Sequence, residues 1–232
     1  MPTNAALPTV AELGGVPLLS GCDPRRLAQL AQSLRLRFFA KGETVLAQGE
    51  AGQDLYFLLS GQLLANRYSI DGQEVGYRRL VAPTHFGELS ALDGAPRSIN
   101  VTAATDARVA TMSHADFGAL LEAEPRLARQ LLIELAGRVR ELSDRLFEAG
   151  TVDTRGRVAA QIVRIAVAAG ATEDGVALFP APTHAELAAM VGGTRETVTR
   201  SLSQLADAGV LVKEGRRIVI RQFDALMALS GG

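Results

Sequence analysis

A carboxylate, a guanidinium and a hydroxyl stand close together along the chain, in Phe86-Gly87-Glu88-Leu89 and in Pro96-Arg97-Ser98. The carboxylate of Glu88 can accept a hydrogen bond from a ribose hydroxyl, and Arg97 can fork onto a phosphate and neutralise its charge. The hydroxyl of Ser98 and the backbone N–H groups of a short turn can donate to the remaining phosphate oxygens. These are the groups that a cyclic nucleotide requires.

A second cluster of chemically capable residues lies about a hundred residues later, in Thr194-Arg195-Glu196-Thr197-Val198-Thr199-Arg200. On a helix, Arg195, Glu196 and Arg200 would share one broad exposed face. Arginine forks onto guanine O6 and N7, and glutamate accepts a hydrogen bond from cytosine N4. The segment therefore predicts a helix that reads base edges, with a buried opposite face formed by Val198, Leu202 and Leu205.

The first cluster lies in a region of short apolar runs that alternate with glycines, from 35 to 112. Asp71-Gly72 is a strong signal for a hairpin turn. Regular short strands separated by glycine turns predict a small antiparallel barrel or jelly roll. Before this region we expect an arm of about twenty residues and a helix that begins at Pro24 with Asp23 as its N-cap.

A long helix is predicted over 126–147, because its apolar residues recur at steps of four and three. This seam is narrower than the apolar stripe of most globular helices and favours a parallel dimer. A helix packed on its own domain is the alternative. The seam consists of Ala128, Leu132, Leu135, Val139, Leu142 and Leu146.

The segment after this helix has the pattern of a helix-turn-helix followed by a hairpin. Gly150 is suited to end the long helix as a C-cap, and an amphipathic helix is expected over 157–169. Thr183 and Glu186 form a capping box that begins a short helix ending near 190. A double glycine then makes the turn, Thr194 caps a helix reaching about 208, and strands over 210–213 and 217–220 form the hairpin. This order predicts a winged helix-turn-helix.

Together the two clusters resemble the phosphate-binding cassette and the recognition helix of the cyclic AMP receptor protein / fumarate-nitrate regulator (Crp/Fnr) family of bacterial transcription regulators. The resemblance implies an α+β chain of three parts. These are an N-terminal arm with a cyclic-nucleotide-binding β jelly-roll barrel over 1–125, a dimerisation helix over 126–149 and a winged helix-turn-helix over 150–232.

By this resemblance, Glu88 binds the ribose hydroxyl, Arg97 and Ser98 bind the phosphate, and Gly87 and Leu89 belong to the same cassette. Leu142 and Ser143 fall where the family contacts the base from the dimerisation helix. The resemblance implies a cyclic nucleotide effector, with cyclic AMP preferred. Cyclic GMP, cyclic di-GMP and a barrel that has lost its ligand remain as alternatives.

The resemblance also implies roles in DNA binding. Arg195, Glu196 and Arg200 would read palindromic half-sites of the TGTGA type, as a homodimer on double-stranded DNA. Thr194, Thr197 and the wing residue Arg216 match positions that touch phosphate, which sets affinity and register rather than sequence choice. RNA polymerase is a further expected partner. The basic excess over 194–221, six basic residues against three acidic ones, is consistent with DNA binding.

Composition excludes several other classes of protein. Cys22 is the only cysteine, so the chain has neither an internal disulfide nor an iron–sulfur cluster. His85, His114 and His184 lack metal-ligand spacing, which argues against a jelly-roll metalloenzyme, and we expect no haem or other metal. No catalytic constellation is present, and His85 is expected as a polar loop residue. Without a signal peptide or a membrane-spanning run, the expected location is the cytoplasm.

Overall fold

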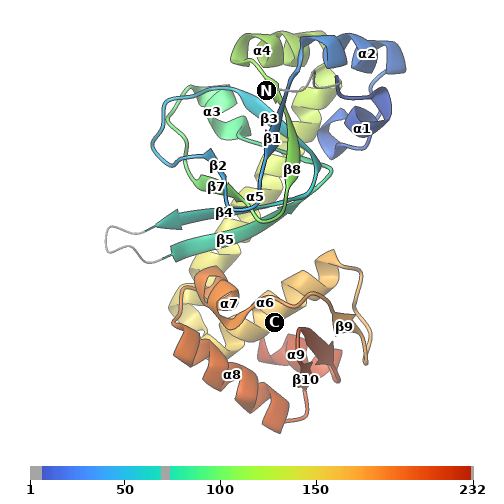
Figure 1. Cartoon of the computed structure of the whole chain (residues 1–232). Coiled ribbons are helices and arrows are strands. Elements are labelled where there is room, and N and C mark those ends of the chain that lie inside the picture. Colours follow the sequence, from blue (N-terminus) through green and yellow to red (C-terminus); the bar gives the residue numbers. More distant parts are fainter. Residues whose placement is uncertain (1–6, 69–73, 231–232) are drawn as a thin grey trace. The chain divides into compact units, whose positions relative to one another are not determined.

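The computed structural model describes residues 7–68 and 74–230 (Figure 1). It divides into two compact units, Met1–Tyr68 with Arg78–Gly137, and Ser69–Tyr77 with Arg138–Gly232. The chain passes from the first unit to the second inside one long helix, α5 (Pro125–Thr151).

The described strands between residues 35 and 112 form two sheets of four strands each. One sheet contains, in spatial order, β1 (Arg35–Phe39), β8 (Ala107–Met112), β3 (Leu55–Ser60) and β6 (Thr84–Phe86). The other contains β2 (Thr44–Leu46), β7 (Asn100–Ala103), β4 (Gln62–Tyr68) and β5 (Glu74–Val81). The registered pairings are antiparallel, which confirms the predicted β barrel. The predicted Asp71-Gly72 turn lies outside the described residues.

Strand β3 explains how the barrel joins the helices around it, because it is buried on both faces. Successive side chains of a strand point to opposite faces. Tyr56 and Leu58 belong to the apolar core shared with the second sheet, and Leu55 and Phe57 belong to the core shared with the helices. The uninterrupted apolar run at this position is therefore a strand between two cores.

The prediction of an N-terminal arm is wrong from residue 10 onward. Helix α1 (Val10–Gly14) and the 3-10 turn η1 (Pro17–Leu19) bury four apolar side chains almost completely, Leu13, Val16, Leu18 and Leu19. They pack with α2 (Pro24–Ser33), α4 (His114–Ala123) and the beginning of α5. Asp23 caps α2 as predicted, since its carboxylate accepts from the Arg25 N–H at 2.7 Å.

Helix α5 is longer than predicted, since it begins at Pro125 and continues through Gly150 to Thr151. Gly150 is not a C-cap: it is not among the glycines with positive φ, and the Thr151 hydroxyl donates to the Phe147 carbonyl as in a continuing helix. The next helix, α6 (Thr154–Ala168), begins three residues earlier than predicted because Asp153 caps it. Arg164 of α6 binds Glu148 of α5 with both terminal nitrogens, at 2.6 and 3.1 Å.

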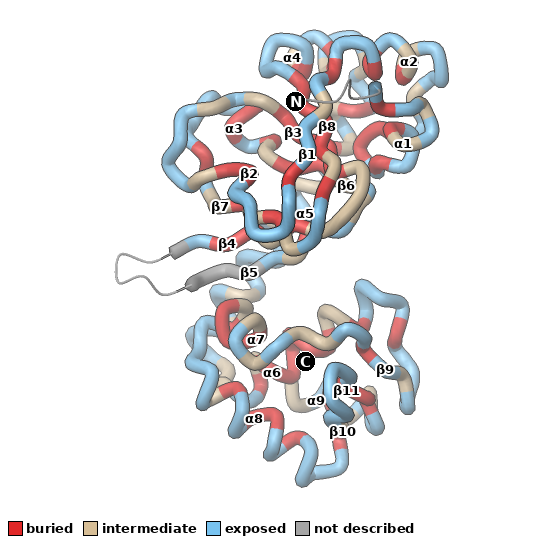
Figure 2. Tube along the Cα trace, viewed as in Figure 1, coloured by how far each residue is buried: buried red, intermediate tan, exposed pale blue. Residues whose placement is uncertain are grey.

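Figure 2 colours the chain by burial, and the exposed fractions of the seam residues divide the predicted seam of α5 into two parts. Ala128 and Leu135 are half-buried, and Leu135 packs against the helical core of its own unit. The other four seam residues, Leu132, Val139, Leu142 and Leu146, are between 62 and 77% exposed in the single chain. The packed alternative therefore holds for Leu135, and an apolar face remains uncovered along the rest of the helix.

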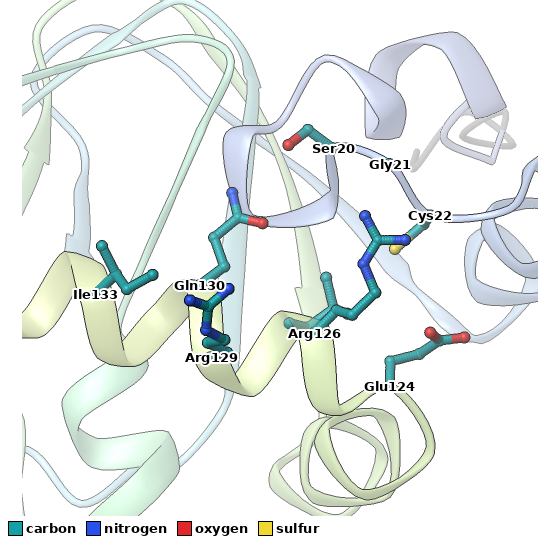
Figure 3. Close-up of a pocket in the computed structure, with 9 residues that line it drawn as sticks. Ser20, Gly21, Cys22, Glu124, Arg126, Arg129, Gln130 and Ile133 are labelled. Carbon is teal, nitrogen blue, oxygen red and sulfur yellow. The ribbon is translucent and has the colours of Figure 1, made fainter.

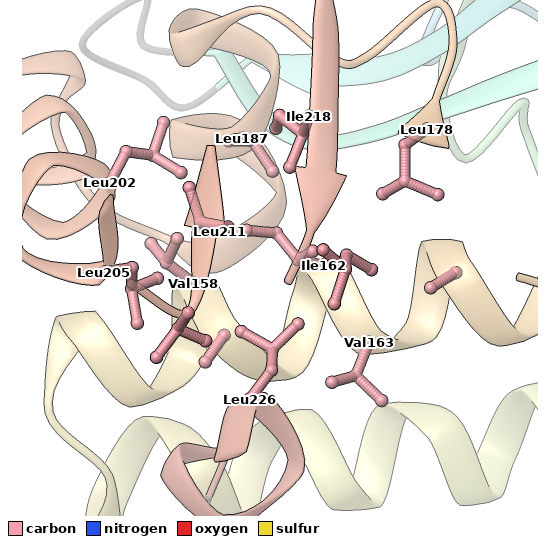
Figure 4. Packing of buried hydrophobic residues seen from close by; sticks show 14 of the residues in the cluster. Val158, Ile162, Val163, Leu178, Leu187, Leu202, Leu205, Leu211, Ile218 and Leu226 are labelled. Carbon is pink, nitrogen blue, oxygen red and sulfur yellow. The ribbon is translucent and has the colours of Figure 1, made fainter. Parts of the chain in front are cut away.

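The second unit has the predicted winged helix-turn-helix. Around one apolar core (Figure 4) it places α6, α7 (His184–Val191), α8 (Arg195–Asp207), β10 (Leu211–Glu214) and β11 (Arg217–Ile220). A third strand, β9 (Ala177–Leu178), pairs with β11, and α9 (Phe223–Leu229) packs on α6. Neither was predicted, because two residues are too few for a strand pattern and α9 is only two turns long.

Candidate functional site

The cassette begins at a glycine that no other residue can replace without strain. Gly87 has φ +81°, follows strand β6, and is the N-cap of the short helix α3 (Glu88–Asp93). A Cβ at this position would lie 3.0 Å from Nη1 of Arg97 and 3.1 Å from the Tyr56 ring. The left-handed backbone and the close approach both require glycine.

The side chain of Arg97 packs against this turn, and only 4% of the residue's surface is exposed. Its Nη1 donates to the Gly87 carbonyl at 3.2 Å, and its Nη2 donates to the Asp54 carbonyl at 2.9 Å. The guanidinium carbon lies 5.2 Å from the centre of the Tyr56 ring, which stacks on Phe86 at 5.1 Å. A buried guanidinium on neutral acceptors keeps its positive charge, which suits it to an anionic ligand.

The remaining cassette residues differ in exposure. Glu88 is 4% exposed in the first turn of α3, whereas Ser98 and Leu89 are exposed. The backbone of Arg97 is tied to the loop after β2, because its N–H donates to the Glu50 carbonyl and its carbonyl accepts from Gly49. The structure thus brings Gly87 and Arg97 into contact, with Glu88 as the next residue.

Sequence reasoning missed the upstream half of this site. Tyr56, Asp54 and Gly52 all contact Arg97, although they lie more than 40 residues before it in the chain. Burial raises the pKa of the Tyr56 hydroxyl, and the neighbouring Arg97 partly opposes that effect. Tyr56 sits in an apolar strand pattern, which gave no signal for a binding role.

Leu142 and Ser143 belong to the part of α5 that is grouped with the second unit. Leu142 is 64% exposed, and the Ser143 hydroxyl donates to the Val139 carbonyl at 3.0 Å. Such a bond within the helix occupies the hydroxyl proton and leaves the oxygen lone pairs available.

His85 is not the polar loop residue that we expected. It lies in strand β6, is 4% exposed, and its Nε2 is 3.5 Å from a carboxylate oxygen of Glu134 on α5. His114 is the first residue of α4 and its Nδ1 lies 2.8 Å from the Ala91 carbonyl. Within the described ranges, no group of three or more His, Cys, Asp or Glu residues could hold a metal ion.

Cys22 lines a pocket of about 220 Å³ at the start of α5 (Figure 3). Ser20, Arg126, Arg129 and Gln130 also line this pocket. Burial raises the pKa of the Cys22 thiol, and the carboxylate of Glu124 adds to the effect. The raised pKa lowers the fraction of thiolate, the nucleophilic form, at neutral pH.

Helix α8 presents the second cluster as predicted. Its N-terminus is closed by a reciprocal cap, in which Thr194 Oγ1 accepts from the Thr197 N–H at 3.2 Å and Thr197 Oγ1 accepts from the Thr194 N–H at 3.0 Å. The apolar side, Val198, Leu202 and Leu205, is buried. The side chains of Arg195, Glu196 and Arg200 are exposed.

Electrostatics keep Glu196 ionised. A hydrogen bond from its own backbone N–H at the helix N-terminus, the Thr194 hydroxyl and the charge of Arg195 all lower the pKa of its carboxyl. An ionised carboxylate accepts hydrogen bonds and cannot donate them, so it favours an amino group over a carbonyl oxygen. Arg216 is exposed in the turn between β10 and β11, and its carbonyl accepts from the Ala181 N–H at 2.9 Å.

A β barrel with a phosphate-type cassette, a long helix and a winged helix-turn-helix define a class of protein, the ligand-responsive DNA-binding regulators. Residues 36–124 match the cyclic nucleotide-binding domain, and residues 156–229 match the Crp-like helix-turn-helix domain. The chain is 33% identical over 211 residues to a "CRP-like cAMP-activated global transcriptional regulator" of Mycobacterium tuberculosis, across 90% of this chain and 94% of that protein. The chain belongs to the Crp/Fnr family of transcription regulators.

Solved structures agree with this assignment. The Thermus thermophilus catabolite activator protein is 31% identical, with a TM-score of 0.55 over 93% of this chain and 99% of that one. The c-di-GMP responsive global regulator CLP of Xanthomonas campestris has a TM-score of 0.71 over 86% of this chain and 99% of that one. At 20% identity, the second likeness shows the fold alone.

The chain is thus a Crp-like, cyclic nucleotide-binding transcription regulator. Regulators of this family bind DNA and act as dimers, and the family consists of transcription regulators rather than enzymes. Among the described residues, no helix is both long enough and apolar enough to cross a membrane.

Proposed function

We propose that this chain is a homodimeric regulator that binds cyclic AMP through its cassette and then binds palindromic DNA with TGTGA-type half-sites. The observation that carries the proposal is the placement of Arg97. Its guanidinium is buried, bound to two backbone carbonyls, and lies against the one glycine that opens the cassette. The three-part organisation, 1–125, 126–149 and 150–232, is part of the same proposal.

The cassette supports a cyclic nucleotide as follows. A cyclic phosphate would exchange its own oxygens for the carbonyls of Gly87 and Asp54 on Arg97, which replaces neutral acceptors with charged ones. Glu88 would accept from the ribose hydroxyl, with Ser98 and the Leu89 backbone at the rim. Cyclic AMP is favoured because the relatives that cover most of the chain are named for it, such as the "Cyclic AMP receptor protein" of Thermus thermophilus at 30% identity.

The uncovered face of α5 supports the homodimer. Four apolar side chains, Leu132, Val139, Leu142 and Leu146, follow each other at the steps of a seam and are largely exposed in the single chain. A second copy in parallel would bury them against their own equivalents. In such a dimer Leu142 and Ser143 would lie at the interface, where Leu142 offers no hydrogen bond to a base.

The exposed face of α8 supports sequence reading. Arg195 and Arg200 would fork onto guanine, ionised Glu196 would accept from cytosine, and Arg216 would touch phosphate from the wing. Two such helices in a dimer fit successive major grooves, about 34 Å apart. As a transcription regulator the complex would also contact RNA polymerase.

A calorimetric titration tests the effector. Protein freed of bound nucleotide is titrated with cyclic AMP, cyclic GMP and cyclic di-GMP, and we expect the largest affinity for cyclic AMP. Arg97→Ala should lose at least about a hundredfold in affinity, because a desolvated charged contact costs about 3 kcal/mol or more. Arg25→Ala, which removes an exposed arginine from α2, is the matched control.

The titration also separates the alternatives. Tighter binding of cyclic GMP or cyclic di-GMP would change the effector and keep the regulator. Absence of heat with all three nucleotides would contradict an effector-responsive barrel and favour a regulator that binds DNA without ligand.

A further inference from the structure

A chain of three hydrogen bonds links the wing, α7 and the recognition helix α8. The Lys213 ammonium lies 2.6 Å from Nε2 of His184, and Nδ1 of His184 lies 2.7 Å from the Thr199 hydroxyl. The Thr199 hydroxyl donates to the Arg195 carbonyl at 2.8 Å. Lys213 is in β10, His184 is the first residue of α7, and Arg195 and Thr199 are in α8.

The groups at the two ends of this series of hydrogen bonds decide which atom donates and which accepts in each bond. An ammonium can only donate, so Nε2 of His184 must accept. The proton of a neutral ring then resides on Nδ1 and is donated to the Thr199 oxygen, whose own proton goes to the Arg195 carbonyl. All three hydrogen bonds form together only when His184 is neutral and in the Nδ1–H tautomer.

The surroundings of His184 favour that neutral ring. Burial, the charge of Lys213 and the charge of Arg195 all lower the pKa of its imidazole, in that order of size. His184 lines a groove of about 300 Å³. Arg216, Thr183 and Pro182 line the same groove. On the ring's own helix, the Glu186 carboxylate is bound to the backbone N–H of Thr183. The cations facing the ring therefore come from β10, the wing turn and α8.

We propose that His184 is a positioning residue for DNA recognition, which fixes the wing against the first two turns of the recognition helix. The proposal rests on the DNA-binding role given above. A lysine side chain loses much rotamer freedom when it is held, and His184 holds Lys213 beside Arg195 and Arg216 before DNA arrives. The three cations then face the DNA as one preformed surface, which lowers the cost of ordering them on binding.

Nuclear magnetic resonance tests the hydrogen-bond chain without DNA. The full chain is labelled with ¹⁵N-histidine, and His184→Gln identifies the His184 signals among those of the three histidines. We expect the Nδ1–H tautomer, and a rise in the pKa of His184 in Lys213→Met. The control, Arg217→Met, removes a cation that lies 5.3 Å from the Phe179 ring and should leave that pKa unchanged. An Nε2–H tautomer, or a pKa indifferent to Lys213→Met, would overturn the proposal.

DNA binding tests the positioning role. Affinity is measured by fluorescence anisotropy on a TGTGA palindrome and on a scrambled duplex, with cyclic AMP present, for His184→Ala, Lys213→Met and the double variant. Each single change should weaken binding to the palindrome about three- to tenfold, the range of one net hydrogen bond. The double variant should be little weaker than Lys213→Met alone, because the two residues act through one contact.

His184→Gln gives a second readout, since its amide can accept from Lys213 and donate to Thr199. It should recover most of the affinity lost in His184→Ala. Additive losses in the double variant, or a glutamine variant as weak as the alanine variant, would overturn the positioning role. A wild-type chain that binds both duplexes equally would contradict the proposed half-site, while the resonance experiment would still decide the hydrogen-bond chain.

Discussion

At the scale of single residues, the nucleotide cassette depends on a backbone conformation as much as on side chains. Gly87 adopts φ +81° and touches Arg97, so one residue determines both where α3 begins and where the guanidinium lies. Gly42 has a similar φ, +90°, but a Cβ added there would meet open space, and its N–H donates to the Ala103 carbonyl rather than to Arg97. The pair separates backbone strain from the contact with Arg97.

We predict that Gly87→Ala lowers the free energy of unfolding by at least about 1–2 kcal/mol, the cost of a left-handed non-glycine residue. It should also abolish most nucleotide binding, because the new methyl group displaces the Arg97 guanidinium. Gly42→Ala should cost similar stability and keep nucleotide affinity. Urea unfolding and calorimetric titration of both variants are the measurements. Equal loss of affinity in the two variants would contradict a specific role for the Gly87–Arg97 contact.

We predict that the free energy of unfolding depends on pH through His184. Its pKa is lower in the folded chain than in the unfolded one, so the unfolded state binds the proton more readily. The stabilisation is complete above the ordinary histidine pKa of about 6.5 and is lost as the pH falls through the lower folded value. Urea unfolding between pH 7.5 and 5, at about half-unit steps, should show a steeper acid loss for wild type than for His184→Gln. Identical slopes would show that another group carries the acid dependence.

At the scale of elements, the apolar residues of α5 differ in burial between the beginning of the helix and its later turns. Leu127 and Leu131 are buried in the helical core of the first unit, and Val139, Leu142 and Leu146 are exposed further along. An apolar face that is exposed along a long helix is expected to pack against a partner. The substitutions that test the dimer are therefore best placed at the exposed apolar residues after Leu135.

Val139→Glu combined with Leu142→Glu should convert the dimer to a monomer, because four carboxylates would replace apolar side chains that meet across the symmetry axis. Analytical ultracentrifugation gives the mass, and circular dichroism should show an unchanged helix content. Gly137→Glu is the control, since its Cβ position meets open space off the seam. A double variant that stays dimeric would place the interface elsewhere on the chain.

At the scale of the whole molecule, the proposed regulator recognises bases and binds DNA phosphates with residues from different elements. Arg200 is exposed on α8 and Arg216 is exposed in the wing turn, so each can be changed without opening the apolar core. The difference between them should appear only when affinities on two DNA sequences and at several salt concentrations are compared.

We predict that Arg200→Ala costs about 1–3 kcal/mol per half-site on a TGTGA palindrome and little on a scrambled duplex. Arg216→Ala should weaken binding to both duplexes alike and reduce the slope of log affinity against log salt by about one per subunit. Competition assays from 50 to about 200 mM salt measure both effects. Equal loss on the two duplexes for Arg200→Ala would mean that this arginine reads no base.

Features that depend on interactions between neighbouring residues could be predicted from the amino-acid sequence. The capping box of Thr183 and Glu186, the N-cap Thr194, the turn glycines and the period of each apolar pattern are local features. They predict the winged helix-turn-helix and most of the barrel. The likeness of the cassette and of α8 to known motifs is local in the same sense. The prediction that Gly150 ends the helix is wrong, because the helix continues through it to Thr151 despite the preference of glycine for helix ends.

Contacts between distant segments became visible only in the folded chain. Tyr56 and Asp54 reach Arg97, the N-terminal residues Leu13 and Val16 become core, and His184 joins Lys213 to Thr199. No periodicity encodes such pairs, because they depend on how strands and helices from separate parts of the chain are brought together by burial of their apolar faces. An isolated histidine or tyrosine in the sequence therefore gives no sign of its partner.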